Sequence, residues 1–455
     1  MTTQTDDPQK ADPQPTPEAA PAAMSSRAVL GLRNFRLLWI AQAISDLGDG
    51  LTNLALLLLV NALTGSTAAL AVMAIVLAVP PMTIGLIAGV YVDRLDRRRI
   101  MLASDLLRVA IVLGFVFVRS ADQVWILFVL GFVEATVGTF FTPARMALVP
   151  TIVPREGLLA ANGLSQASRI IAMTVGAGAA GVLFGLAGSA WPAFVGDSLT
   201  FLISFLLVAQ VRASGKAAAR PAAQPAGQPG DAGGPGMRAE LAEGLAIIAR
   251  SPVLVGTLVS VGVLMLGIGA VNVLFIPLLI NNLHVPTTWV GLVEVAQTSS
   301  MILSAVLVTA IARRLKPTSI VTIALAGIAV LVTLLAGVTA IGQVILILFL
   351  VGWLVSPLNA AAMTILQTSV AGNARGRVSA ALNAIMSAAS IASMAAAGLL
   401  GAAIGVQNVF VVAGLVTAGS AVLAFILFRR VASSSRATDR SGQPVTLGDP
   451  HWDPE

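Results

Sequence analysis

The sequence predicts an all-α membrane protein of about twelve transmembrane helices in two six-helix pseudo-repeat bundles, with both termini in the cytoplasm. Three observations lead to this fold. The chain of 455 residues is 57% hydrophobic and only 11% charged, whereas soluble domains carry about 25% charged residues. Apolar runs of the roughly 20 residues that cross a bilayer recur along the whole chain. Arg and Lys gather in alternate loops between these runs, which is the positive-inside pattern.

The predicted spans follow from the apolar runs, and the basic residues orient them. The spans are 36–60, 68–91, 100–118, 124–144, 162–187, 191–211, 253–280, 289–312, 318–337, 341–366, 378–402 and 407–430. A cytoplasmic N-terminus leaves Arg119 as the one Arg or Lys in an outer loop. Trp125, Trp191 and Trp289 then open helices at the outer interface, where aromatic belts form.

Composition divides the chain into five segments. Residues 1–30 are polar and Pro-rich, with no basic region before an apolar core, and predict a disordered cytoplasmic tail and not a signal peptide. The bundles are 31–211 and 253–430. Between them, 212–252 is a Pro-, Gly- and Ala-rich linker that ends in a short amphipathic surface helix. Residues 431–455 form a second cytoplasmic tail.

The two halves echo each other at an offset of about 215 residues, as the repeats of alternating-access carriers do. Phe141-Thr-Pro143 matches Val355-Ser-Pro357, and the Gly-rich stretch around Gly178 matches the small residues before Gly398. Chance similarity between two helices rich in small residues is the alternative.

Several classes of function are excluded by what the sequence lacks. The chain has no Cys and only two His, so we expect no cofactor and no metal site. The net charge of +6 is spread between apolar runs, which argues against nucleic acid as a partner. No nucleotide-binding loop is present to use ATP. We expect no enzyme, because no nucleophile–base pair stands at helical spacing, although a membrane-embedded enzyme remains the alternative from another class.

The hairpin GVYVDRLDRRR, residues 89–99, concentrates charge between two spans. Small Gly89 permits a tight turn, and Asp93 with its Arg neighbours can form charge-assisted hydrogen bonds to neighbouring helix ends. Such bonds can lock a gate, whereas the alternative is a basic loop that only fixes topology. We assign gating to Gly89, Asp93, Arg94, Arg97, Arg98, Asp105 and Arg108.

Charged residues inside the spans are the candidates for coupling, because each costs about 2.5–3.5 kcal/mol to insert. Asp46 and Asp49 lie three residues apart on one helix face, about 15 Å into the first span. Two close carboxylates in a dry cavity cannot both ionise cheaply, so one can carry a proton. Hydrogen bonding to Gln42 or Asn53 is the structural alternative. The proton-coupling candidates are Asp46, Asp49 and Glu134.

Other polar residues within the spans are candidates for the substrate cavity. Arg169 can pair with Glu134 or with the Asp46 and Asp49 face. Asp197 and Glu294 lie near outer helix ends, where we expect water to reach them. The cavity candidates are Asn53, Arg169, Asn272, Glu294, Gln297, Trp353, Asn359 and Asn383. Hydrogen bonds between helices are the alternative role for the amides, and packing for Trp353.

The hairpin resembles the loop signature of the major facilitator superfamily, G-x-x-x-D-R-x-x-R-[RK], with Asp96 where that family often has Gly. Residues 32–51, 141–153 and 160–169 resemble its drug and siderophore exporters, such as macrolide efflux and enterobactin exporters. The antiporter signature is only partly met, because Ala177 stands where Pro is expected.

The resemblance implies export of small amphipathic, often cationic, molecules across a bacterial cell membrane by alternating access, as a proton antiporter in which Asp46 or Asp49 exchanges the proton. Its implied partners are such a substrate, protons and membrane lipids, and we expect a monomer. A lysophospholipid or other lipid translocator of the same fold is the alternative, since related lipid carriers share the loop signature.

Overall fold

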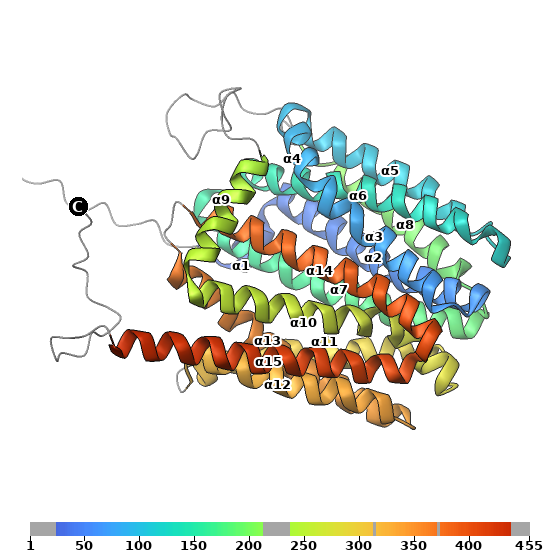
Figure 1. Cartoon of the computed structure of the whole chain (residues 1–455). Coiled ribbons are helices and arrows are strands. Elements are labelled where there is room, and N and C mark those ends of the chain that lie inside the picture. The colour runs from blue at the N-terminus through green and yellow to red at the C-terminus, as the bar shows by residue number, and fades with distance from the viewer. Residues whose placement is uncertain (1–23, 213–236, 313–314, 371–373, 438–455) are drawn as a thin grey trace, which may run out of the picture.

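The computed structural model describes residues 24–212, 237–312, 315–370 and 374–437, and no strand occurs among them. Figure 1 shows long helices that run side by side. The first half holds α1 (Ser26–Gly31), α2 (Arg33–Thr64), α3 (Thr67–Thr83), α4 (Gly85–Arg94), α5 (Arg97–Phe115), α6 (Val124–Ile152), α7 (Leu158–Ala187) and α8 (Trp191–Val208). After α9 (Met237–Arg250), the second half holds α10 (Pro252–Pro277), α11 (Thr288–Ala312), α12 (Pro317–Leu334), α13 (Ile341–Ser369), α14 (Arg375–Ile404) and α15 (Val406–Ala437).

Ten helical segments within the described residues are long and apolar enough to cross a membrane. The other two predicted spans correspond to α3 with α4, and to α5. The predicted span 68–91 is wrong as one helix: α3 ends at Thr83 and α4 begins at Gly85, just after Pro80 and Pro81. At Ile84, between the two helices, the backbone keeps a right-handed helical conformation and its N–H donates to the carbonyl of Pro80 at 2.8 Å, so the break is one residue long. Helix α5 is set apart by its charge, which includes Asp105 and Arg108.

Several helices also run further than their predicted spans, among them α6 and α13. Helix α6 continues past Pro143 and Pro150 to Ile152, and α13 continues past Pro357 to Ser369. Proline is tolerated inside membrane helices because neighbouring groups satisfy the freed carbonyls. The short helices are Ala121–Gln123, Arg155–Gly157 and Leu335–Gly337, with a π-helical turn at Leu278–Asn282.

Helices α2 and α7 pack with their backbones almost in contact, and they position the cavity described below. A Cβ on Gly176 would overlap the carbonyl oxygen of Leu47, and one on Gly50 would overlap that of Met173. Small residues allow this approach, which gives close van der Waals contact where lipid offers no hydrophobic driving force.

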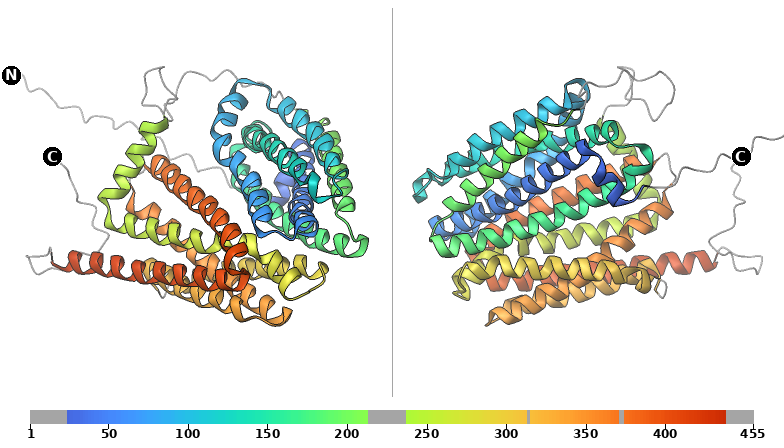
Figure 2. Two further views of the ribbon diagram at one scale, coloured as in Figure 1. Left: turned by 45° about the vertical axis from the view of Figure 1, so that its right-hand side comes forward. Right: turned by 180° about the vertical axis from the view of Figure 1, so that it is seen from behind.

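The two halves meet along α7 with α11 and along α3 with α14 (Figure 2). A Cβ on Gly291 of α11 would lie 2.6 Å from the Cα of Gly178 in α7. Thr67, the first residue of α3, donates a hydrogen bond of 2.9 Å to the carbonyl of Gly398 in α14. These contacts lie where α7 and α14 end and where α3 and α11 begin. The halves are therefore closed together at the end that the predicted topology places outside.

The surface helix predicted between the halves is α9, which lies against α14 and α10. Glu243 of α9 forms an ion pair of 3.2 Å with Arg377 of α14, and Ile248 is buried. The linker before α9, residues 213–236, and the tails at 1–23 and 438–455 lie outside the described residues.

Candidate functional site

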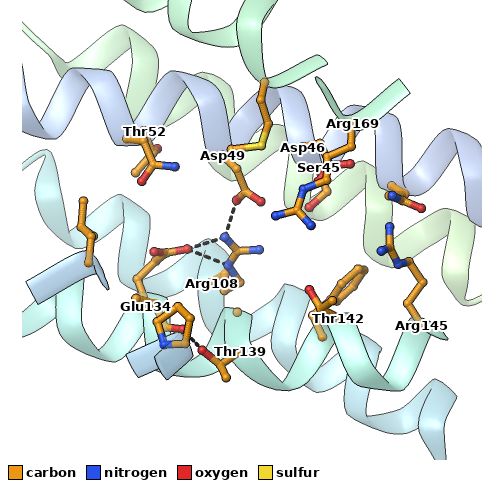
Figure 3. A pocket seen from close by; sticks show the side chains of 18 of the residues that line it. Ser45, Asp46, Asp49, Thr52, Arg108, Glu134, Thr139, Thr142, Arg145 and Arg169 are labelled. Atoms are coloured by element: carbon orange, nitrogen blue, oxygen red, sulfur yellow. Dashed lines mark hydrogen bonds and ion pairs between the residues drawn. The ribbon is translucent and has the colours of Figure 1, made fainter. Parts of the chain in front are cut away.

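A cavity of about 480 Å³ lies within the first half, lined by residues of α2 to α7 (Figure 3). Its apolar lining includes Leu77, Pro81 and Met173. The ionisable residues that line it are Asp46, Asp49, Arg108, Glu134, Arg145 and Arg169. The cavity thus combines an apolar wall with a small set of charges, as pockets for small molecules commonly do.

The deepest charges form one group, the Arg108 cluster, which consists of Arg108, Asp49 and Glu134. Arg108 Nε donates to Glu134 Oε1 at 2.8 Å, and Nη2 of the same guanidinium forms ion pairs with both carboxylates. The guanidinium carbon lies 4.0 Å from the centroid of the Phe201 ring, which adds a cation–π contact. Arg108 and Glu134 are each only 6% exposed.

The Arg108 cluster holds more acids than cations. One guanidinium neutralises one carboxylate, so the cluster carries one excess negative charge when both acids are ionised. It becomes neutral when one acid holds a proton. Because a buried net charge is costly, each carboxylate is stabilised by the guanidinium that it shares.

The position of Arg108 corrects two sequence-based expectations. Arg108 and Asp105 make their contacts away from the hairpin: Arg108 lies about 16 Å along α5 from Arg97, and Asp105 accepts a hydrogen bond of 2.8 Å from Ser204 of α8. A pair between Glu134 and Arg169 is also wrong, because Arg108 occupies Glu134.

Arg169 lies instead beside Asp46, the other alternative that the sequence left open. Its Nε is 3.9 Å from Asp46 Oδ1, which is a loose contact, and the Arg169 side chain is 40% exposed. The second carboxylate oxygen of Asp46 is buried and has no hydrogen-bond partner among the described residues. Asn53, one turn beyond Asp49, also lines the cavity.

Asp197 is a buried acid and not the water-accessible one expected from its place in the sequence. It is 0% exposed, and it accepts hydrogen bonds from Thr52 Oγ1 at 2.6 Å and from Thr200 Oγ1 at 3.0 Å. Thr52 belongs to α2, so the bond joins α2 to α8. Sequence position alone could not find this partner, which is far away in the chain.

Two arginines of the hairpin donate hydrogen bonds to backbone carbonyls of neighbouring helices. Arg98 donates to the carbonyls of Val208 and Ala209 at the end of α8, at 3.2 Å and 2.5 Å. Arg97 donates to Ala147 of α6 at 3.2 Å. These bonds stay within the first half. The side chain of Asp93 and the contacts of Gly89 lie outside what the structure describes. Arg94 is exposed and is the last residue of α4.

The candidates in the second half do not line this cavity. Asn272, Asn359 and Asn383 are exposed, whereas Glu294, Gln297 and Trp353 are partly buried. Trp353 stacks on Phe349 with ring centroids 6.4 Å apart, which is a packing contact within α13.

A family model described as Major Facilitator Superfamily matches residues 38–341 and 257–450. The chain belongs to this superfamily. It is an integral membrane protein that passes the membrane several times. Macrolide efflux protein A of Streptococcus pyogenes is 26% identical over 278 residues, which is 60% of this chain and 65% of that protein, just under two thirds of its length.

Other relatives cover more of this major facilitator protein. The multidrug efflux pump Tap of Mycolicibacterium fortuitum is 27% identical over 401 residues, covering 83% of this chain and 92% of Tap. Among solved structures, the nucleoside transporter NupG has a TM-score of 0.64 at 13% identity, covering 88% of this chain and 99% of NupG. A bacterial homologue of the iron transporter ferroportin, in its inward-facing state, has a TM-score of 0.67 at 16% identity, with coverages of 88% and 99%. At these identities the structures show the fold alone.

Proposed function

We propose that this major facilitator protein exports small amphipathic molecules by alternating access, driven by inward flow of protons. The observation that carries the proposal is the Arg108 cluster, in which one buried guanidinium is shared by Asp49 and Glu134 inside a cavity. Relatives named as efflux proteins support the direction of transport. A proton gradient is the fitting energy source because the sequence has no nucleotide-binding loop.

The contacts favour Asp49 and Glu134 over Asp46 as the proton carrier. Either acid can take the proton while the other keeps the ion pair with Arg108, so the guanidinium is never left alone in the protein interior. Protonation would then shift Arg108 between its two partners. Both partners lie on different helices, α2 and α6, so this exchange would alter the contact between them and couple proton binding to helix movement.

Transport into inside-out membrane vesicles tests the proposal. Vesicles with an acidic interior are offered a macrolide, ethidium, dansylglycine and a fluorescent lysophospholipid. We expect at least one soluble compound to accumulate and to leave when a protonophore is added. Asp49→Asn and Glu134→Gln should each abolish accumulation, whereas Asp122→Asn, in an exposed outer turn, should not.

Two outcomes would reject the proposal. Accumulation that persists in the presence of protonophore, or in both cluster variants, would remove the Arg108 cluster from coupling. Exchange of the lysophospholipid between leaflets without a gradient, with no accumulation of the soluble compounds, would favour the lipid translocator.

A further inference from the structure

A second set of charges lies in the same cavity, away from the Arg108 cluster. At this end Arg169 is 40% exposed on its side chain and Met146 is 65% exposed, and we call it the mouth of the cavity. Arg145 of α6 and Arg169 of α7 both line the mouth, and Figure 3 shows their side chains reaching into the cavity from different walls. Arg145 forms no ion pair with any residue that the structure describes.

The mouth also holds a hydrogen-bond donor, the side-chain amide of Gln42, that has no acceptor among the described residues. Gln42 of α2 is 4% exposed, and its Nε2 is buried without a partner among the described residues. A buried donor without an acceptor costs free energy, so such a group marks a place where something else accepts. Asp46, one helical turn along, is the acid beside the two arginines.

The mouth has more positive than negative groups. Two guanidinium groups face the single carboxylate of Asp46, so the mouth keeps one excess positive charge when all three are ionised. The mouth also holds one unpartnered donor, Gln42 Nε2, and one unpartnered acceptor, Asp46 Oδ2. An oxyanion supplies the missing negative charge, and guanidinium groups bind carboxylates and phosphates through paired hydrogen bonds.

We propose that Gln42, Arg145 and Arg169 form a binding subsite for the anionic group of the substrate, a carboxylate or phosphate on a small amphipathic molecule. Asp46 is its internal competitor, because it holds Arg169 when no substrate is bound. This inference rests on the proposed function, since it names the substrate class of that same cavity. A purely cationic amphiphile would meet Arg145 and Arg169 before it reached the Arg108 cluster, and is disfavoured.

The scaffold around the subsite is suited to hold it. Trp39 of α2 donates a hydrogen bond of 2.8 Å from Nε1 to Oγ of Ser168, the residue before Arg169. This bond ties α2 to α7 at the mouth, while the glycine contacts tie the same helices deeper in the protein. Gln42 and Arg169 are therefore carried on two helices that keep their relative position.

Binding to the purified protein in nanodiscs tests the subsite without any gradient. Three probes share one fluorophore: dansylglycine is an anion, dansylglycinamide is neutral and dansylcadaverine is a cation. We expect dansylglycine to bind at least tenfold more tightly than the other two. Arg145→Gln and Arg169→Gln should each weaken dansylglycine about tenfold and leave dansylglycinamide unchanged, whereas Arg145→Lys should recover part of the loss.

The Asp46 variant gives a result of opposite sign. Asp46→Asn should strengthen dansylglycine binding several-fold, because the competing carboxylate is removed. Arg155→Gln, an exposed arginine outside the cavity, is the matched control and should bind like the unaltered protein. Equal binding of dansylglycine and dansylglycinamide, or unchanged affinity in both arginine variants, would overturn the subsite.

Competition identifies which oxyanion the subsite prefers. Lysophosphatidic acid that displaces dansylglycine from the unaltered protein, and does so about tenfold more weakly from Arg145→Gln, supports the subsite with a phosphate ligand. If only carboxylates displace the probe, the subsite stands as a carboxylate site. Because binding needs no proton gradient, loss of the subsite and loss of proton coupling are separate results.

Discussion

At the scale of single residues, the dominant feature is one buried cation shared by two acids. Arg108 has Asp49, Glu134 and the ring of Phe201 around its guanidinium. Removal of one partner from a buried ion pair costs about 3–5 kcal/mol, because the remaining charge is left without compensation. Arg108 therefore stabilises the packing of α5 against α2 and α6.

We expect Arg108→Gln to destabilise the protein and a second substitution, Glu134→Gln, to restore much of the stability. Arg108→Gln leaves Asp49 and Glu134 together without a cation and should lower the unfolding temperature, with a loss of about 3–5 kcal/mol. The double variant Arg108→Gln with Glu134→Gln should recover much of that loss, because one of the two unpaired acids is gone. Tryptophan fluorescence during heating in detergent measures both. Arg119→Gln, exposed in an outer loop, is the control, and an unaltered unfolding temperature for Arg108→Gln alone would contradict the reasoning.

The sequence was enough to predict the acids that line the cavity, but not which residues they contact. Burial cost alone singled out Asp46, Asp49 and Glu134, and all three line the cavity. The partners depend on how helices face each other, which no local pattern encodes. Arg108 was therefore assigned to the wrong neighbours, and the bond from Thr52 to Asp197 could not be foreseen.

At the scale of elements, the contact between α2 and α7 carries the cavity. The glycines of α7 have different surroundings: Gly176 lies against the backbone of α2, whereas a Cβ on Gly163 would meet nothing within 4 Å. The Gly-rich pattern in the sequence predicted close packing. It could not tell which glycine touches which helix, because that depends on the rotation of α7 about its axis.

The two glycines should respond to the same substitution with opposite sign. Gly176→Ala forces α2 and α7 apart and should destabilise the protein by about 1–3 kcal/mol, as overpacking does. Gly163→Ala should be neutral or stabilise by up to about 1 kcal/mol, since alanine favours a helix more than glycine does. Thermal unfolding in detergent compares them, and equal effects would show that the helix contact is not tight.

At the scale of the whole molecule, the contacts between the halves follow the internal repeat. Helix α7 meets α11 through Gly181 and Gly291, and α14 meets α3 through Gly398 and Ala71. Since α7 and α14 are equivalent in the repeat suggested by the sequence, the two contacts are related by the same symmetry. The sequence predicted two halves from the linker and the repeat, but not which end of the halves is closed. That choice depends on a balance of interhelical contacts that differ little in sequence.

Alternating access requires these contacts to open, and a reversible cross-link can prevent it. The chain has no Cys, so an introduced pair has no competitor. A Cβ at Gly178 would lie 3.2 Å from a methyl of Val295, within the reach of a disulfide. We expect oxidised Gly178→Cys with Val295→Cys to lose accumulation in inside-out vesicles and to regain it on reduction. Dansylglycine binding should persist in the oxidised protein, because the cavity belongs to the first half alone. Each single variant, oxidised in the same way, controls for the substitutions. If the fully cross-linked protein transported as fast as the protein with its disulfide reduced, the halves would not need to separate at this end.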